Sequence, residues 1–252
     1  MAKRLKTITA GRLVVVGCYT IPTPRSTERE RKALREISSA AQMTINANRS
    51  WQRLELLLAA NFGRRDLHVV LTYDDEHLPA NRQAAVQRVR KMLPQLRAVR
   101  KSRGQELKYI YVTEQLSSEG GRLHHHMVVN GTGADVLRSL WPYGEVELET
   151  LDTWQGYEAL AKYLTKEPRE LGKPEVGARN WAASIGLTKP KVESEIVKDN
   201  LTVAAPPGAV ILSAPPPVRN EFGEFVMLKY YLPIKKKEEK KGSRPPRRRK
   251  KE

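Results

Sequence analysis

The chain has 252 residues, a single cysteine (Cys18), and 17 more Lys and Arg than Asp and Glu. Its length allows one substantial core with a small appendage. One cysteine excludes an intrachain disulfide framework and a thiolate zinc site, which fits a reducing cytoplasm. The apolar run Leu13–Cys18 is too short to span a membrane, and no signal-peptide pattern surrounds it, so we expect a cytoplasmic protein without a membrane partner.

The basic excess favours a polyanionic partner, of which nucleic acid is the first candidate. Residues 235–252 hold 11 basic and 3 acidic residues, and we expect this low-complexity tail to be disordered. The rest of the chain still has a net charge of +9. A basic tail on an ordinary enzyme therefore explains only part of the excess.

The first 64 residues predict a strand and a helical extension. Leu13–Cys18 is the strand candidate, and a turn that contains two prolines follows it. Ser26 is a candidate helix cap. The apolar spacing then predicts a helix to about Phe62, with a break near residues 46–48 and a stop at Gly63.

Residues 65–190 predict an antiparallel sheet with flanking helices. In chain order the elements are a strand at 67–73, a basic helix at 81–103, a strand at 109–114, a strand from His124, a short helix at 136–141, a strand at 144–149 and a helix at 154–166. The strands on either side of the turn at 117–121 predict a hairpin. This order is typical of an α+β domain.

The pattern weakens after residue 190. Residues 191–234 form a poorly defined segment in which Phe222–Leu232 predicts a final strand. The sequence thus divides into an extension (1–64), a central domain (65–190), this segment and the basic tail (235–252).

Three of the five histidines stand together at the start of the strand at 124–129. Successive side chains on a strand point to opposite faces. His124 and His126 therefore share a face, and His125 points the other way. Two imidazoles on one face of a strand suit a divalent metal ion.

Glu114 is the predicted third ligand. It ends the strand that precedes the histidine strand, so a hairpin brings it beside the pair. A carboxylate and two imidazoles leave open positions on an octahedral ion such as Mg²⁺ or Mn²⁺, and phosphate oxygens can occupy them. Such an ion would act as a Lewis acid on the phosphate.

Tyr163 and Lys166 lie three residues apart on one predicted helix face. Tyr163 is the candidate nucleophile, and Lys166 would place an ammonium group near the phosphate or the phenol oxygen. Attack by the phenol would displace a 3′-hydroxyl and leave a 5′-phosphotyrosine. Tyr157 is a rival on the same helix, but it does not share the face of Tyr163.

Each of these residues also has a structural interpretation. A tyrosine on an amphipathic helix is usually a core or boundary residue. The histidines form a solvated stretch, Lys166 a favourable cation in the last helical turn, and Glu114 a surface strand residue in that interpretation. A shared site explains all of them together. His68 and His77 are expected to have structural roles, although strand parity decides whether His68 faces the site.

The sequence Gly121-Arg-Leu-His-His-His126 before an apolar strand, with Tyr163-Leu-Thr-Lys166 on a later helix, resembles the HUH endonucleases. More narrowly it is similar to the rolling-circle replication initiators (Rep proteins) of phages and plasmids. Leu71–Tyr73, Trp141–Gly144 and Ala182–Pro190 add to the resemblance, which covers roughly residues 65–190. One departure is the histidine at 125, where the family has an apolar residue.

The resemblance implies a ferredoxin- or RRM-like sheet with the histidines on a central strand, metal ligands at His124 and His126, and a nucleophile at Tyr163. It also implies nicking of single-stranded DNA or an origin hairpin in the cytoplasm of a bacterial host. No Walker A pattern occurs in the sequence, so a host helicase would unwind the DNA and a host polymerase would copy it. The basic helix and the tail would bind phosphates.

Two alternatives stay open. The same chemistry serves a relaxase or a transposase of this superfamily, and the residues do not separate these from an initiator. A non-catalytic nucleic-acid-binding protein with a decayed motif would show no dependence on metal, His124 or His126.

Overall fold

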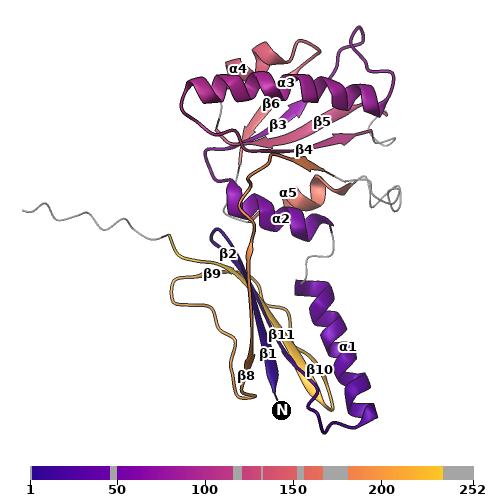
Figure 1. Cartoon of the computed structure of the whole chain (residues 1–252), viewed down its shortest axis with the longest axis vertical. Helices are drawn as coiled ribbons and strands as arrows, with labels where there is room; N and C mark the ends of the chain where they lie inside the picture. Colours follow the sequence, from indigo (N-terminus) through magenta and orange to yellow (C-terminus); the bar gives the residue numbers. More distant parts are fainter. Residues whose placement is uncertain are drawn as a thin grey trace, which may run out of the picture.

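The computed structural model describes residues 2–45, 50–115, 121–131, 133–151, 156–166 and 181–234. Within these residues the chain forms five α-helices and two antiparallel sheets (Figure 1), which confirms the predicted α+β class. The predicted basic tail lies outside them. No helix in the described part of the chain is both long and apolar enough to cross a membrane.

One sheet, here called the histidine sheet, contains the strands predicted for the central domain. Its order is β6 (Val146–Thr150), β3 (Leu67–Leu71), β5 (His124–Val129), β4 (Tyr109–Glu114) and β7 (Ala182–Ala183). The predicted hairpin of β4 and β5 is confirmed, and β5 is the central strand.

Helices α3 (Arg82–Ser102) and α4 (Ala134–Leu140) cover one face of the histidine sheet (Figure 1). The side chain of Asn81 caps α3 by accepting a hydrogen bond from the Ala84 amide at 2.9 Å. The helix buries a stripe with helical spacing, which consists of Ala85, Val89, Met92, Leu93, Leu96 and Arg100. This stripe and the inward side chains of β3, β4 and β5 form the largest core cluster.

Helices α2 (Ser50–Asn61) and α5 (Glu158–Tyr163) cover the opposite face. Leu54 and Leu58 of α2 pack with Ile110 and Val128 of the sheet. The helix that sequence analysis assigned to the N-terminal extension is therefore divided, and its second half is part of the packing around the histidine sheet.

The second sheet, here called the terminal sheet, joins the two ends of the described chain. Its order is β10 (Val218–Asn220), β11 (Gly223–Tyr231), β2 (Leu13–Thr20), β1 (Lys3–Ala10) and β8 (Lys191–Val197), and β9 (Val210–Ser213) also pairs with β11. Helix α1 (Glu28–Ile45) packs on one face of it. The predicted final strand is confirmed as β11.

Sequence analysis did not predict β1, β8, β9 or β10, nor that residues 3–20 pair with residues 191–231. Local periodicity reports which face of a segment is apolar, not which distant strand it pairs with. In β8 six of seven residues are exposed, so that strand has no apolar alternation to detect. A second correction concerns the cap of α1, where Thr27 Oγ1 accepts from the Glu30 amide and the Ser26 hydroxyl bonds back to Thr23.

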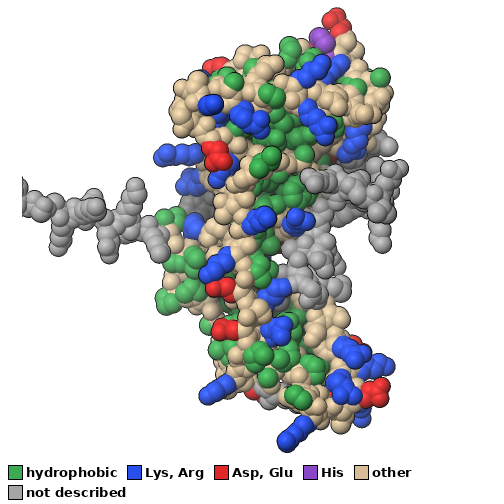
Figure 2. Space-filling model, viewed as in Figure 1, with side chains coloured by type: hydrophobic (Ala, Val, Ile, Leu, Met, Phe, Trp, Pro, Cys, Tyr) green, Lys and Arg blue, Asp and Glu red, His purple; other side chains and the backbone are tan. Residues whose placement is uncertain are grey.

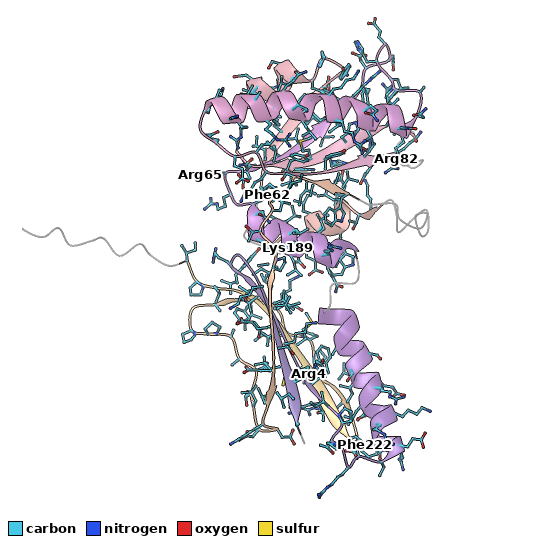
Figure 3. All side chains as sticks on the ribbon, viewed as in Figure 1. Arg4, Phe62, Arg65, Arg82, Lys189 and Phe222 are labelled. Atoms are coloured by element: carbon cyan, nitrogen blue, oxygen red, sulfur yellow. The ribbon has the colours of Figure 1, made fainter. Side chains whose placement is uncertain are left out.

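Contacts between the terminal sheet and α2 fix the two sheets to each other. Gly11, in the turn between β1 and β2, has φ of +58°, and a Cβ there would lie 2.3 Å from the carbonyl oxygen of Ala59. Only glycine fits this position. Figure 3 shows Phe62, at the end of α2, and Lys189, before β8, between the two sheets.

An ion-pair cluster also joins β11 to the helices of the site face. The Lys229 ammonium lies 2.5 Å from a carboxylate oxygen of Glu55 in α2 and 2.7 Å from one of Glu158 in α5. Lys229 and Glu55 are buried. Removing one partner of such a pair leaves a buried charge uncompensated. The terminal sheet therefore helps to hold α5, the helix that carries Tyr163.

Candidate active site

Strand pairing brings three predicted ligands to one face of the histidine sheet. Glu114 lies directly opposite His124 in the β4–β5 ladder, and Val112 lies opposite His126. Residues opposite each other in an antiparallel pair share a face. His124, His126 and Glu114 therefore all point toward α2 and α5, whereas His125 points toward α3.

The three side chains form a compact group of ligand atoms. Nε2 of His124 is 3.7 Å and Nε2 of His126 is 3.5 Å from Oε2 of Glu114. One ligand atom from each residue lies within 4.8 Å of the others, a spacing that a single metal ion can bridge. Nδ1 of His124 is 3.1 Å from the Arg122 carbonyl oxygen. A carbonyl only accepts, so Nδ1 carries the proton and Nε2 keeps its lone pair.

The carboxylate of Glu114 is fully buried, and neither oxygen has a hydrogen-bond partner in the described part of the chain. Burial by itself would raise the pKa of this group. The close approach of His124 and His126, together with the Lys166 ammonium, outweighs burial and lowers the pKa to about 2. The carboxyl group is therefore ionised at neutral pH, which is the form that binds a cation.

Tyr163 lies beside this group. Its hydroxyl oxygen is 3.3 Å from Nε2 of His126, and the two rings are 4.9 Å apart between centroids. The side chain is accessible, since Tyr163 is 41% exposed. Tyr163 is the last residue of α5, and Lys166 follows one turn later. Nζ of Lys166 lies 4.3 Å from the centre of the Tyr163 ring and 3.6 Å from Oε2 of Glu114.

His68 is a member of the site that sequence analysis assigned a structural role. It lies on β3 opposite Val128, so it shares the face of His126. Its ring stacks on that of His126 at 5.4 Å between centroids and meets the edge of Tyr163 at 6.3 Å. Burial, with the charge of His126, lowers the pKa of His68 to about 4, so the ring is neutral at neutral pH. The parity of β3 relative to β5 was the signal that could have found it.

His125 lies on the opposite face in an aromatic environment. Its Nε2 shares a hydrogen bond of 2.7 Å with the Tyr73 hydroxyl, and its Nδ1 shares one of 2.8 Å with the hydroxyl of Thr113. The ring is fully buried and packs edge-on against Trp141. The polar residue at this position of the motif is thus accommodated by two hydroxyl partners.

The turn at 141–144, part of the family resemblance, locks onto the end of β3. The Trp141 indole donates to the carbonyl of Thr72 at 2.8 Å. A Cβ on Gly144 would lie 2.7 Å from that same carbonyl oxygen and 2.8 Å from Cα of Tyr73, so the backbones approach too closely for any other residue. The turn thereby fixes Tyr73, which in turn holds His125.

Two other candidates lie away from the ligand group. Tyr157, the rival nucleophile, is buried, and its hydroxyl donates to the Phe62 carbonyl at 2.6 Å. His77 pairs with the adjacent Asp74 at 2.7 Å on the exposed side of the loop after β3.

The basic helix α3 contains seven Lys and Arg residues and no acidic residue. Its exposed basic side chains include Arg90, Lys91, Arg97 and Lys101. Figure 2 shows Lys and Arg side chains over the part of the molecule that α3 occupies. Because α3 covers the face away from His126, its outer surface is suited to hold a phosphate backbone but not the phosphate at the ligand group.

Comparison with known proteins agrees with this arrangement. Residues 66–168 match the family model of the replication-associated protein ORF2. The match spans β3 to α5 and contains all five predicted site residues, His124, His126, Glu114, Tyr163 and Lys166. The predicted resemblance to replication initiators is confirmed at this level. No curated protein and no solved structure showed a significant match.

The match to this replication-associated family supports a role in DNA replication, with DNA binding as its corollary, and the His–His–Glu group supports metal-dependent nuclease activity. The individual roles of the five site residues stay predictions.

Proposed function

We propose that this protein is a replication initiator that nicks single-stranded or origin DNA by attack of Tyr163 on a phosphate, in rolling-circle replication. The observation that carries the proposal is the position of the Tyr163 hydroxyl, 3.3 Å from Nε2 of His126 at the edge of the His–His–Glu group. The family match over residues 66–168 supports the biological setting.

The donor set suits a divalent metal ion with oxygen and nitrogen ligands. Glu114 brings an ionised, buried carboxylate without hydrogen-bond partners in the described residues, a state that costs free energy unless a cation occupies the site. His124 and His126 would complete the protein's ligands, and Mg²⁺ or Mn²⁺ is the expected ion. When bound, such an ion supplies Lewis-acid polarisation of the phosphate and charge stabilisation in the transition state.

In the proposed reaction the phenol oxygen of Tyr163 forms a bond to phosphorus, and the bond from phosphorus to the 3′-oxygen breaks. The phenol loses its proton, the 3′-oxygen gains one, and the 5′ end stays attached as a phosphotyrosine. Because one phosphoester replaces another, the strand can later be rejoined. The Lys166 ammonium, above the Tyr163 ring, would stabilise negative charge on the phenol oxygen or the phosphate.

The proposal includes the DNA partners. A single strand or an origin hairpin would cross the site face, and the outer surface of α3 would hold phosphates elsewhere on the molecule. Host helicase and polymerase would then extend the 3′ end. A relaxase or a transposase would use the same residues, but the match to a replication-associated family favours the initiator.

The test uses labelled single-stranded DNA from the replicon that encodes the protein, with Mn²⁺ or with EDTA, on a denaturing gel. We expect label to migrate with the protein only when metal and Tyr163 are both present. Tyr163→Phe should abolish the adduct and leave DNA affinity within about twofold, because only one hydroxyl is removed from a partly exposed side chain. Tyr157→Phe is the matched control and should retain the adduct. Binding without an adduct across the whole replicon would instead support the non-catalytic alternative.

A further inference from the structure

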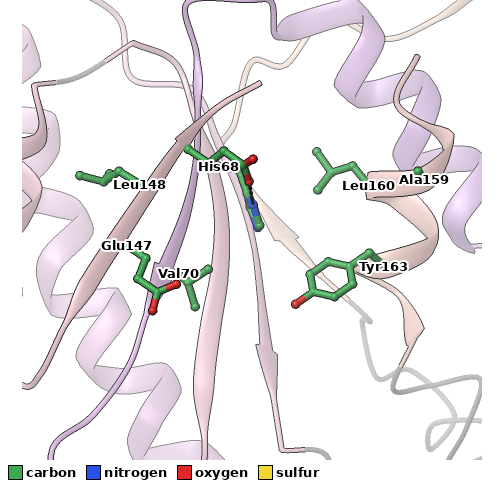
Figure 4. A pocket seen from close by; sticks show the side chains of 8 residues that line it. His68, Val70, Glu147, Leu148, Ala159, Leu160 and Tyr163 are labelled. Atoms are coloured by element: carbon green, nitrogen blue, oxygen red, sulfur yellow. Dashed lines mark ion pairs between the residues drawn. The ribbon is translucent and has the colours of Figure 1, made fainter. Parts of the chain in front are cut away.

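A pocket of about 550 Å³ opens beside Tyr163 (Figure 4). Its lining residues come from β3, β6 and α5: His68, Val70, Glu147, Leu148, Glu149, Ala159, Leu160 and Tyr163. The volume is within the usual range of small-molecule pockets, roughly 300–1,000 Å³. None of the predicted metal ligands is among the described residues that line it.

Strand register explains why the pocket has an acidic wall. Glu147 lies opposite Val70 and Glu149 lies opposite His68 in the β3–β6 ladder, so both glutamates point to the site face. Both are exposed at the pocket, and the Glu149 carboxylate is 4.0 Å from Nδ1 of His68. The remaining wall is apolar or aromatic. The lining residues in the described part of the chain include no Lys or Arg.

This chemistry disfavours a phosphate and suits a flat ring with hydrogen-bond donors. Two carboxylates without a cation repel a phosphate. A nucleobase, in contrast, buries its faces against Val70, Leu160 and the Tyr163 ring and directs its exocyclic amino group to a carboxylate, since unstacked bases are read through such contacts with their edges. Adenine, cytosine and guanine offer an amino group. Thymine offers one N–H between two carbonyl oxygens, which a carboxylate repels.

Proximity indicates where that base belongs in the strand. The His68 ring forms one wall of the pocket and stacks on the predicted ligand His126, with ring centroids 5.4 Å apart. Tyr163 faces both the pocket and the ligand group. A strand whose scissile phosphate lies at the ligand group therefore has a neighbouring base within reach of the pocket.

We propose that this pocket binds a nucleobase next to the scissile phosphate and selects a base with an exocyclic amino group over thymine, through Glu147 and Glu149. The inference rests on the proposed nicking function and adds a specificity to it. Because a glutamate accepts hydrogen bonds whereas a glutamine also donates them, Glu→Gln at both positions should remove the bias against thymine carbonyls.

The experiment first maps the nick on the protein's own replicon and then places each of the four bases at the two positions on either side. With the wild-type chain, thymine at one position should slow adduct formation about tenfold relative to the best amino-bearing base, as one good base contact gives. The double variant Glu147→Gln/Glu149→Gln should reduce this ratio below about twofold. The matched control is Glu145→Gln, which removes the same charge on the same edge and face but does not line the pocket.

A second readout separates this inference from the nicking proposal. Equilibrium binding of the same oligonucleotides is measured alongside adduct formation. Base-selective binding that the double variant loses, without any adduct, would contradict the tyrosine chemistry and support the pocket. An adduct with equal rates for all four bases, or a preference unchanged in the double variant, would overturn the pocket. Competition by free nucleosides as strong as by the oligonucleotide would also overturn it, because the occupant would then be a small molecule.

Discussion

The two faces of β5 hold neighbouring histidines in opposite states of hydrogen bonding. On the α3 face, both ring nitrogens of His125 have a hydroxyl partner, and the ring is packed among Tyr73 and Trp141. On the α5 face, Nδ1 of His126 and both oxygens of Glu114 are buried without a partner in the described residues. One strand therefore presents a completed polar network on one side and an incomplete one on the other.

This difference separates a structural histidine from candidate ligands better than the sequence motif does. Buried polar groups in folded proteins are nearly always hydrogen-bonded, so an unsatisfied cluster requires an explanation. A metal ion would provide it on the α5 face, whereas the α3 face needs nothing further. The comparison predicts that substitutions on the two faces affect different properties.

The largest expected effect on stability is that of His125→Ala. This change leaves a cavity and removes the partners of the buried Tyr73 and Thr113 hydroxyls, and it should reduce the free energy of unfolding by about 3 kcal/mol. Urea denaturation measures the loss. His124→Ala, on the other face of the same strand, is the control and should cost at most about 1 kcal/mol. Equal losses in the two variants would mean that the faces do not differ as described.

The arrangement of the histidine sheet could be predicted from sequence to a considerable extent. Alternation along β5 placed His124 and His126 on one face, and the hairpin placed Glu114 opposite them. Each inference used residues within a few positions of a turn, where register follows from loop length. The basic helical segment predicted at 81–103 likewise lies within one residue of the observed bounds of α3.

Long-range pairings could not be predicted in this way. The position of His68 depends on the register of β3 against β5, some 56 residues apart, and a shift of one residue would turn it to the other face. The pairing of β2 with β11 joins segments about 200 residues apart. The Lys229 cluster with Glu55 and Glu158 depends on both sheets being in place, so no local pattern indicates it.

A second prediction concerns the unsatisfied face. If Glu114, His124 and His126 hold an ion, Mn²⁺ at a hundred times its dissociation constant should add about 2.7 kcal/mol to the free energy of unfolding. Glu114→Gln should remove most of this gain, because the only anionic ligand of the group is lost. Thermal unfolding with Mn²⁺ and with EDTA measures it, and Glu145→Gln controls for the loss of one negative charge. A gain that persists in Glu114→Gln would place the ion elsewhere.

The smallest expected effect is a dependence of stability on pH that the satisfied face should dominate. Burial, with the nearby His124, His126 and Arg82, lowers the pKa of His125 from its ordinary 6.5 to about 3, so the ring stays neutral in the folded chain and becomes charged only on unfolding. Below pH 6.5 the unfolded state binds the extra proton, and stability falls by about 1.4 kcal/mol per pH unit for one such group. His68, with a pKa of about 4, adds to the slope over the same range. Glu114 contributes only below its ordinary value of 4.5. Urea denaturation in EDTA between pH 7 and 5 therefore isolates the histidines. His125→Gln, which keeps a neutral polar group but cannot bind the proton, should reduce the slope by about one proton relative to the wild-type chain. An unchanged slope would show that His125 is already protonated in the fold, which its two hydroxyl partners and full burial oppose.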